Sequence, residues 1–228
     1  MGMILTDEQQ AILDGSRGET MAKVMKTLVM FGEAFHAEKM VPVTSRYNHL
    51  VTSFGLGVLQ PVYDLMQQLI DAGAVSGQKF SADPRPLDPN VPANLLQQLV
   101  FKKFMYNKQD FYEGQLQKLG LMDKDAFTCT CYMPEVGNKP EKGEILSWSE
   151  SSAVVYANSV LGARCNRNSG ILDIMGSIVG STSGSARSLT MRPAPTSRTS
   201  ARPPPPTARS ACTTSQTSRR RPRSWARR

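Results

Sequence analysis

Apolar residues recur at spacings of three and four in several stretches of the chain, and this spacing predicts amphipathic helices. The clearest stretch is residues 19–38, whose apolar face consists of Met21, Val24, Met25, Leu28, Phe31 and Phe35. A capping-box pair, Thr6 and Gln9, predicts a shorter helix over residues 7–14. The same reading predicts further helices at 58–72, 92–106, 108–119, 151–161 and 171–180.

Short β-prone runs lie between these helices. The run "MVPVTS" (40–45) predicts a buried strand that leads into a polar loop, and "AFTCTCY" (126–132) alternates in the manner of a strand. The run "SADPRPLDPNVP" (81–92) must be a loop, because its prolines cannot donate backbone hydrogen bonds. Helices that alternate with short strands predict an α/β fold with functional loops at the strand ends.

The charge of the chain is unevenly distributed. Residues 181–228 contain 11 Arg and no Lys, Asp or Glu, together with ten Ser, eight Thr and seven Pro. Of the 27 basic residues in the chain, 16 therefore lie in residues 1–180 beside all 19 acidic ones, which gives this part a net charge of −3. Such a tail has too little apolar surface to offset the entropy lost on folding, so we expect it to be disordered.

The composition of this tail also indicates its origin. Arg, Ala, Pro, Ser and Thr without Lys are what a GC-rich gene yields in a wrong reading frame, so we interpret residues 181–228 as a frameshifted segment. The alternative is a nucleic-acid-binding protein whose arginine-rich tail contacts RNA or DNA phosphates. The single tail aromatic, Trp225, and the acidic character of residues 1–180 argue against that class.

Four cysteines at irregular spacings do not form the disulfide framework of a small secreted domain. The first residues, "MGMILTDEQQ", lack the basic and apolar regions of a signal peptide, and the sequence contains no run of about 18 apolar residues. We therefore expect a cytoplasmic protein with reduced thiols and no membrane span.

The segment "SWSESSAVVYANSVLGARCNRNSG" (147–170) is the strongest candidate for chemistry. Ser149, Ser151 and Ser152 stand where a helix begins, so free N–H groups and the positive end of the helix dipole would suit a carboxylate or phosphate. An ordinary helix cap explains the same serines. The turn "GARCNRNSG" presents Arg164 and Arg167 around Asn166, which could grip an anion, although paired surface arginines are common.

Three further residues have open roles. Cys129 could be a metal or cluster ligand, a nucleophile, or a small buried apolar residue. His49 could be catalytic or a hydrogen-bonded loop histidine, and Glu150 could be an acid or base or a carboxylate that interacts with the helix dipole.

These motifs resemble one known family. The run "WSESSAVVYANSVLGARCNRNSG" closely resembles the aconitase X signature ESSAV-x-x-ANSVLGARTNR-x-GG, and "CTCYMPEVGNKPEKG" (129–143) is similar to the family's CTPYL-x-GN-x-P-x-x-G. The runs "LTDEQQAILDGSRGE" and "VPVTSRYNHLVTSFG" also stand where the family has its N-terminal motif and its Ser/His/Gly loop. The resemblance covers nearly all of residues 3–182.

The resemblance implies an aconitase-like three-layer α/β/α catalytic domain, here incomplete, and a dehydratase that acts on a small anionic hydroxy acid. Known family activities are dehydration of hydroxyproline-type amino acids and of mevalonate 5-phosphate, with an iron–sulfur cluster as Lewis acid and a smaller swivelling domain or subunit. Cys129 matches the first cluster ligand. The implied catalytic residues are His49, Glu150 and Ser151, and the implied substrate-binding residues are Ser45, Ser152, Asn158, Arg164, Asn166 and Arg167.

Several positions depart from the family pattern. Cys131 replaces the usual Pro and Cys165 the usual Thr, while "SADPRPLDPN" replaces "TTLNP", so the resemblance leaves the substrate and the cluster type open. The family's remaining cluster ligands come from later in its chain, where this sequence has the arginine-rich tail instead. We therefore expect residues 1–180 to be an N-terminal fragment of the catalytic domain that is inactive by itself.

Overall fold

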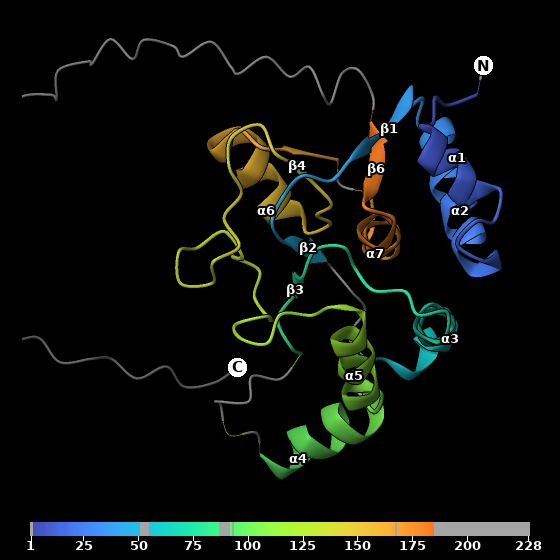
Figure 1. Cartoon of the computed structure of the whole chain (residues 1–228). Helices are drawn as coiled ribbons and strands as arrows, with labels where there is room; N and C mark the ends of the chain where they lie inside the picture. Colours follow the sequence, from blue (N-terminus) through green and yellow to red (C-terminus); the bar gives the residue numbers. More distant parts are fainter. Residues whose placement is uncertain (1, 51–54, 87–91, 93, 167, 185–228) are drawn as a thin grey trace, which may run out of the picture. The chain divides into compact units, whose positions relative to one another are not determined.

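The computed structural model describes residues 2–50, 55–86, 92, 94–166 and 168–184, so Arg167 and most of the arginine-rich tail lie outside it (Figure 1). Its helical elements are α1 (Asp7–Leu13), α2 (Glu19–Ala34), η1 (Gly57–Leu59), α3 (Gln60–Asp71), α4 (Leu95–Gln97), η2 (Gln98–Met105), α5 (Gln109–Leu119), α6 (Ser151–Tyr156), η3 (Ala157–Leu161) and α7 (Gly170–Val179). Its strands are β1 (Lys39–Pro42), β2 (Asn48–Leu50), β3 (Phe80–Ala82), β4 (Ile145–Leu146), β5 (Arg164–Cys165) and β6 (Ser181–Gly184).

The predicted helices are all present, with small differences at their ends. Thr6 and Gln9 form both bonds of the capping box at α1. α2 ends at Ala34, four residues before the predicted end, and His36 just beyond it adopts a positive φ of 58°. The predicted helix over 151–161 begins as α6 and continues as the wider-wound η3, which Gly162 ends in a left-handed conformation.

The strands that carry the site run parallel. β2 pairs with β3, β4 pairs with β5, and a parallel bridge between His49 and Trp148 connects the two pairs. A further parallel bridge joins Ala82 to Phe127. The carboxyl ends of these neighbouring segments therefore meet at one edge, as expected for the α/β class that the sequence predicted.

One strand prediction needs correction. In "AFTCTCY" only Phe127 forms a bridge, because the Thr128 hydroxyl accepts a hydrogen bond from the backbone N–H of Thr130 (3.1 Å) and turns the chain away from the ladder. The sequence assigned residues 181–184 to the disordered tail, and the structure differs there. Ser181–Gly184 form β6, which pairs antiparallel with β1, a long-range partner that the polar composition of the tail does not indicate.

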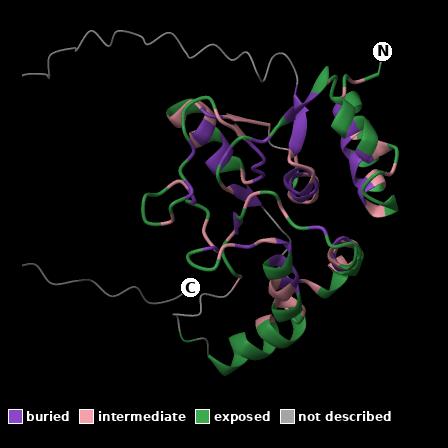
Figure 2. Ribbon diagram, in the orientation of Figure 1, coloured by how far each residue is buried: buried purple, intermediate pink, exposed green. Residues whose placement is uncertain are grey.

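Two apolar clusters hold the described residues together (Figure 2). The larger cluster lies among α2, α3, α5 and α7, and includes the fully buried Met25, Phe80 and Leu116. The smaller one surrounds Trp148 and joins β4 to α6, with Cys131 in its interior. Figure 2 shows that α4 and η2 are largely exposed instead, and neither contains a buried residue in the part of the chain that is described.

Candidate functional site

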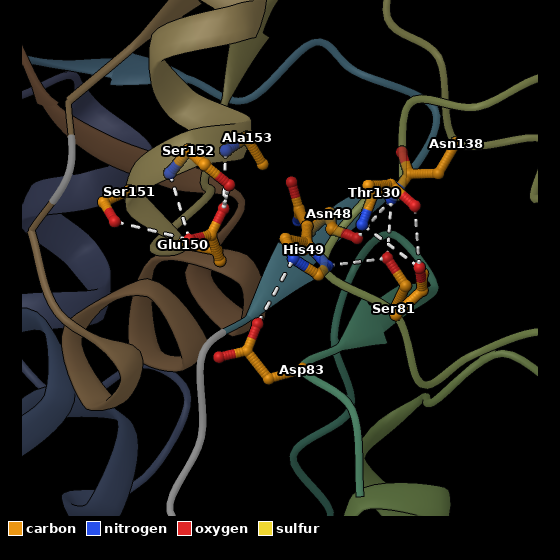
Figure 3. A network of polar contacts seen from close by, with 11 residues as sticks. Asn48, His49, Ser81, Asp83, Thr130, Asn138, Glu150, Ser151, Ser152 and Ala153 are labelled. Carbon is orange, nitrogen blue, oxygen red and sulfur yellow. Dashed lines mark hydrogen bonds and ion pairs between the residues drawn. The ribbon is translucent and has the colours of Figure 1, made fainter. Parts of the chain in front are cut away.

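The carboxyl edge of the parallel strands brings together four segments of the chain. Asp83 directly follows β3, and Glu150 follows the extended residues after β4. Cys129 directly follows Thr128, whose backbone N–H donates to the carbonyl of Ala82 (2.8 Å). His49 lies within β2 between the other segments, as Figure 3 shows. Side chains that leave neighbouring parallel strands at one edge are the usual location of α/β active sites.

His49 is fully buried and uncharged near neutral pH. Its Nδ1 lies 2.9 Å from the Ser81 Oγ, and its ring meets Trp148 edge-on at 5.9 Å. Burial lowers the pKa of His49 to about 4, although the negative charge of Glu150 and a hydrogen-bonding interaction with the Ser81 backbone act in the opposite direction. The 3.7 Å separation between its Nε2 and Asp83 Oδ1 is too long for a hydrogen bond, so this contact is a neutral imidazole beside a carboxyl group.

Asp83 is a site residue that sequence reasoning missed. Burial, and then repulsion by Glu150, raise the pKa of its carboxyl group to about 6, which lets it exchange a proton close to neutral pH. Its Oδ1 is buried and has no hydrogen-bond partner among the residues that the structure describes. In the sequence, only the position of Asp83 directly after a strand (β3) could have indicated a functional role. The surrounding prolines identified the segment only as a loop.

Glu150 occupies the start of α6. Its carboxylate accepts hydrogen bonds from the backbone N–H groups of Ser152 (3.0 Å) and Ala153 (2.5 Å), and from the hydroxyls of Ser151 and Ser152 (Figure 3). Partial burial raises its pKa, but these hydrogen bonds outweigh burial and hold the pKa below its ordinary value. The sequence analysis assigned the free N–H groups at this helix start to a substrate anion. In the structure, the N–H groups of Ser152 and Ala153 instead bind the ionised carboxylate of Glu150.

Two other implied residues make internal contacts. Asn158 donates to the carbonyls of Val154 (2.9 Å) and Cys165 (3.0 Å) and accepts from the Cys165 N–H (3.1 Å), so it ties the helix to β5. Ser45 is buried, and its hydroxyl donates to Asn48 Oδ1 (3.3 Å). Both side chains therefore hold neighbouring backbone segments or side chains in place through hydrogen bonds within the protein.

Arg164 lies beside the first residue of β4. Arg164 pairs in register with Ile145, five residues before Glu150, which corresponds to about 16 Å of extended chain. It lines a small surface hollow together with β6, and its Nη1 is buried without a hydrogen-bond partner in the described ranges. Asn166 lines the same hollow and donates to the Ser183 carbonyl (2.8 Å). Arg167 lies outside the described residues.

The cysteines differ sharply in accessibility. Cys129 is exposed, and its position at the edge suits a metal or cluster ligand. Cys131 is fully buried, and burial followed by the nearby charge of Glu150 raises the pKa of its thiol far above the ordinary value. Burial likewise raises the pKa of the Cys165 thiol, which donates to the Trp148 carbonyl (3.3 Å). Of these three, Cys129 is therefore the cysteine that a metal or a reagent can reach.

An iron–sulfur cluster would need more ligands than this edge offers. No group of three or more His, Cys, Asp or Glu side chains suitable for a metal occurs in the described part of the chain. The described residues by themselves therefore do not provide a complete ligand set for such a cluster.

Comparisons with known proteins match most of the chain. The family model "Aconitase X first domain" matches residues 2–187. The phosphomevalonate dehydratase large subunit of Aeropyrum pernix is 31% identical over 183 residues, covering 79% of this chain and 44% of that protein. The corresponding subunit of Methanothermobacter thermautotrophicus is 32% identical over 183 residues, covering 80% of this chain and 43% of that protein.

Two further relatives extend the comparison. The cis-3-hydroxy-L-proline dehydratase of Pseudomonas aeruginosa is 26% identical over 177 residues, covering 75% of this chain and 27% of that protein. The crystal structure of Thermococcus kodakaraensis aconitase X in its holo-form superposes with a TM-score of 0.63 at 28% identity, covering 79% of this chain and 42% of that one. The expected aconitase X-type fold is thereby confirmed, and the chain spans less than half the length of these relatives.

Proposed function

Because this chain belongs to the aconitase X family, we propose that it forms the N-terminal part of the catalytic domain of a hydro-lyase for a small anionic hydroxy acid. The relatives are named dehydratases of phosphomevalonate and of cis-3-hydroxy-L-proline, so the proposed substrate resembles one of these two compounds. The observation that carries the proposal is the convergence of His49, Asp83, Glu150 and Cys129 on one edge of the parallel strands.

The three titratable side chains suit the removal of water. Dehydration needs a group that takes a proton from carbon and a donor that interacts with the substrate's oxygen. Asp83, with a pKa of about 6, can accept and release a proton near neutral pH. His49 remains neutral, and Glu150 remains ionised and keeps the pKa of Asp83 raised. We assign Ser151, whose hydroxyl bonds Glu150 (3.3 Å), to the same catalytic group.

Substrate binding is proposed for residues on both sides of β5. Ser152 is exposed at the start of α6 and is the implied residue nearest the catalytic group. Arg164 and Asn166 would act from the hollow beside β6, where the unpartnered Arg164 Nη1 can receive an anionic group. Arg167 completes the set on the basis of the sequence pattern, and Ser45 and Asn158 support it through their internal contacts.

The proposed cofactor is an iron–sulfur cluster held in part by Cys129. When bound, such a cluster would act as a Lewis acid on the departing hydroxyl group. Its remaining ligands are proposed to come from polypeptide beyond the described residues, in agreement with the greater length of the relatives.

A small subunit is the proposed protein partner, because the phosphomevalonate relatives are named large subunits. We also propose a cytoplasmic location. Within the described ranges, no helix has the length and apolarity that crossing a membrane requires. Most of the arginine-rich tail lies outside the described residues, and the comparisons lend no support to the nucleic-acid-binding alternative.

A chimera tests the proposed function. Residues 2–187 of this chain would replace the matching segment of the Thermococcus kodakarensis phosphomevalonate dehydratase large subunit, which is 30% identical over 182 residues. The chimeric large subunit would be produced without oxygen, together with the small subunit of the Thermococcus enzyme. We expect loss of water from phosphomevalonate or cis-3-hydroxy-L-proline, with at least about a hundredfold decrease in Cys129→Ala and Asp83→Asn. Cys165→Ala is the matched control.

Two results would contradict the proposal. One is a folded, cluster-containing chimera that dehydrates neither compound. The other is an active chimera whose rate is unchanged by both Cys129→Ala and Asp83→Asn.

A further inference from the structure

A buried amide, Asn138, has both of its N–H bonds committed. Its Nδ2 donates to the Asn48 carbonyl (2.8 Å) and to the Ser81 Oγ (2.9 Å), as Figure 3 shows. Turning the amide over would place its oxygen against the Asn48 carbonyl oxygen, where two acceptors would repel. The orientation of Asn138 is therefore determined by the backbone of β2.

This orientation determines the direction of the next hydrogen bond. Ser81 is fully buried, and its oxygen accepts a hydrogen from Asn138. A hydroxyl has one proton of its own to donate, and His49 Nδ1 lies 2.9 Å from the Ser81 Oγ. Donation from Ser81 to Nδ1 satisfies both groups. The reverse direction would leave the Ser81 proton to find another acceptor in a buried location, which is costly.

A neutral imidazole that accepts at Nδ1 carries its proton on Nε2. The Nε2 of His49 is the atom that faces Asp83 Oδ1, 3.7 Å away. In Figure 3, Ser81 and Asp83 lie on different sides of the His49 ring. We propose that Asn138 and Ser81 are positioning residues that hold His49 as the neutral Nε2–H tautomer and direct that N–H toward the space beside Asp83.

The inference deepens the proposed function and rests on it for its chemical meaning. A neutral imidazole N–H can hydrogen-bond and polarise a substrate oxygen without placing a full positive charge in a buried site. The arrangement uses three segments far apart in the sequence, because Asn138 lies 57 residues after Ser81, which lies 32 residues after His49. The tautomer itself is a property of this chain and can be measured without turnover.

The test is ¹⁵N NMR of the full chain labelled at histidine, recorded at pH 7. The chain contains two histidines, and the exposed His36 provides an internal reference that His36→Gln assigns. We expect the wild-type His49 signals to show a protonated Nε2 and an unprotonated Nδ1. Ser81→Ala should convert the single form into a mixture of both tautomers, because Nδ1 loses its donor.

Asn138→Asp gives a directional test. The new carboxyl group is either ionised, or protonated and donating to the Asn48 carbonyl. In both forms an oxygen that accepts hydrogen bonds faces Ser81, so the Ser81 hydroxyl donates its proton to residue 138. Nδ1 of His49 must then donate, and we expect the Nδ1–H tautomer to predominate. The matched control is Asn158→Ala, which removes a half-buried amide whose three hydrogen bonds go to Val154 and Cys165.

A wild-type His49 protonated on Nδ1 would overturn the inference even if every variant failed to fold. Folded Ser81→Ala and Asn138→Asp proteins that both keep the wild-type tautomer would also overturn it. Neither result depends on the dehydratase chimera, so the failure of one proposal can be told from the failure of the other.

Discussion

The Nε2 of His49 lies 3.7 Å from the Oδ1 of Asp83, and neither atom has a hydrogen-bond partner within the described residues. His49 lies in β2, and Asp83 directly follows the adjacent parallel strand β3, in which Ser81 pairs in register with His49. Burial disfavours the charged form of each group, lowering the pKa of His49 and raising that of Asp83. The fold thus keeps two unsatisfied polar atoms at the edge where the proposed substrate would bind.

Glu150 should control the protonation of both groups. In Glu150→Gln we expect the pKa of His49 to fall further below about 4 and the pKa of Asp83 to fall below about 6, because the negative charge that raises both is removed. The helix cap should weaken by about 1 kcal/mol. NMR titration and urea unfolding measure the two effects. An Asp83 titration identical to that of the wild type would contradict this electrostatic coupling.

The three described cysteines should differ in reactivity. In a Cys212→Ser background, iodoacetamide at pH 8 should modify Cys129 at least about tenfold faster than Cys131 or Cys165, because only Cys129 is exposed. Peptide mapping by mass spectrometry gives the rates. Labelling of the urea-unfolded protein is the control, since all three thiols should then react at similar rates. Rapid labelling of Cys131 in the folded protein would refute its burial beside Trp148.

The buried Asp173 should make the protein less stable as the pH rises. Ser147 Oγ (3.1 Å) and Asn168 Nδ2 (3.0 Å) donate to its Oδ1, yet burial raises its pKa from 3.8 to about 7. Between about pH 4 and 7 the folded state therefore binds more protons than the unfolded state, so its stability falls across this window. Below about pH 4 this contribution is fully present.

Asp173→Asn removes this titration. We expect the variant to match the wild type near pH 4 and to exceed its free energy of unfolding by up to about 4 kcal/mol at pH 8. The lowered pKa of His49 acts oppositely between about 4 and 6.5 but is common to both proteins, so it cancels in the difference. Urea midpoints measured across pH test this, and a difference that is independent of pH would disprove it.

The exposed apolar residues of α4 and η2 should contribute little to stability. Leu96 is 69% exposed and Phe104 is 74% exposed. Replacing both with Lys should change the free energy of unfolding by about 0.5 kcal/mol or less and should reduce self-association. Leu116→Ala, at a fully buried position, should instead cost about 2–5 kcal/mol. Urea unfolding and light scattering measure these effects, and a large stability loss in the Lys variant would show that this helix is covered in solution.

The sequence by itself determined the helices and the family. The spacing of apolar residues identified α2, and the pair Thr6 and Gln9 identified the start of α1, because these features depend on residues within a few positions of one another. The aconitase X signature around Glu150 is also local, and the family model confirms it. Contacts within one helix turn or one motif can be read without knowing the fold.

Only the tertiary structure decided which polar groups meet. Asp83 is one aspartate in a proline-rich loop until β3 places it beside His49, and Asn138 acquires a role only when it reaches the backbone of β2, 90 residues earlier. The polar residues Ser181–Gly184 become a strand because β1 supplies the opposite half of each hydrogen bond. The pKa shifts arise from burial and from charges contributed by distant segments, and sequence spacing contains neither quantity.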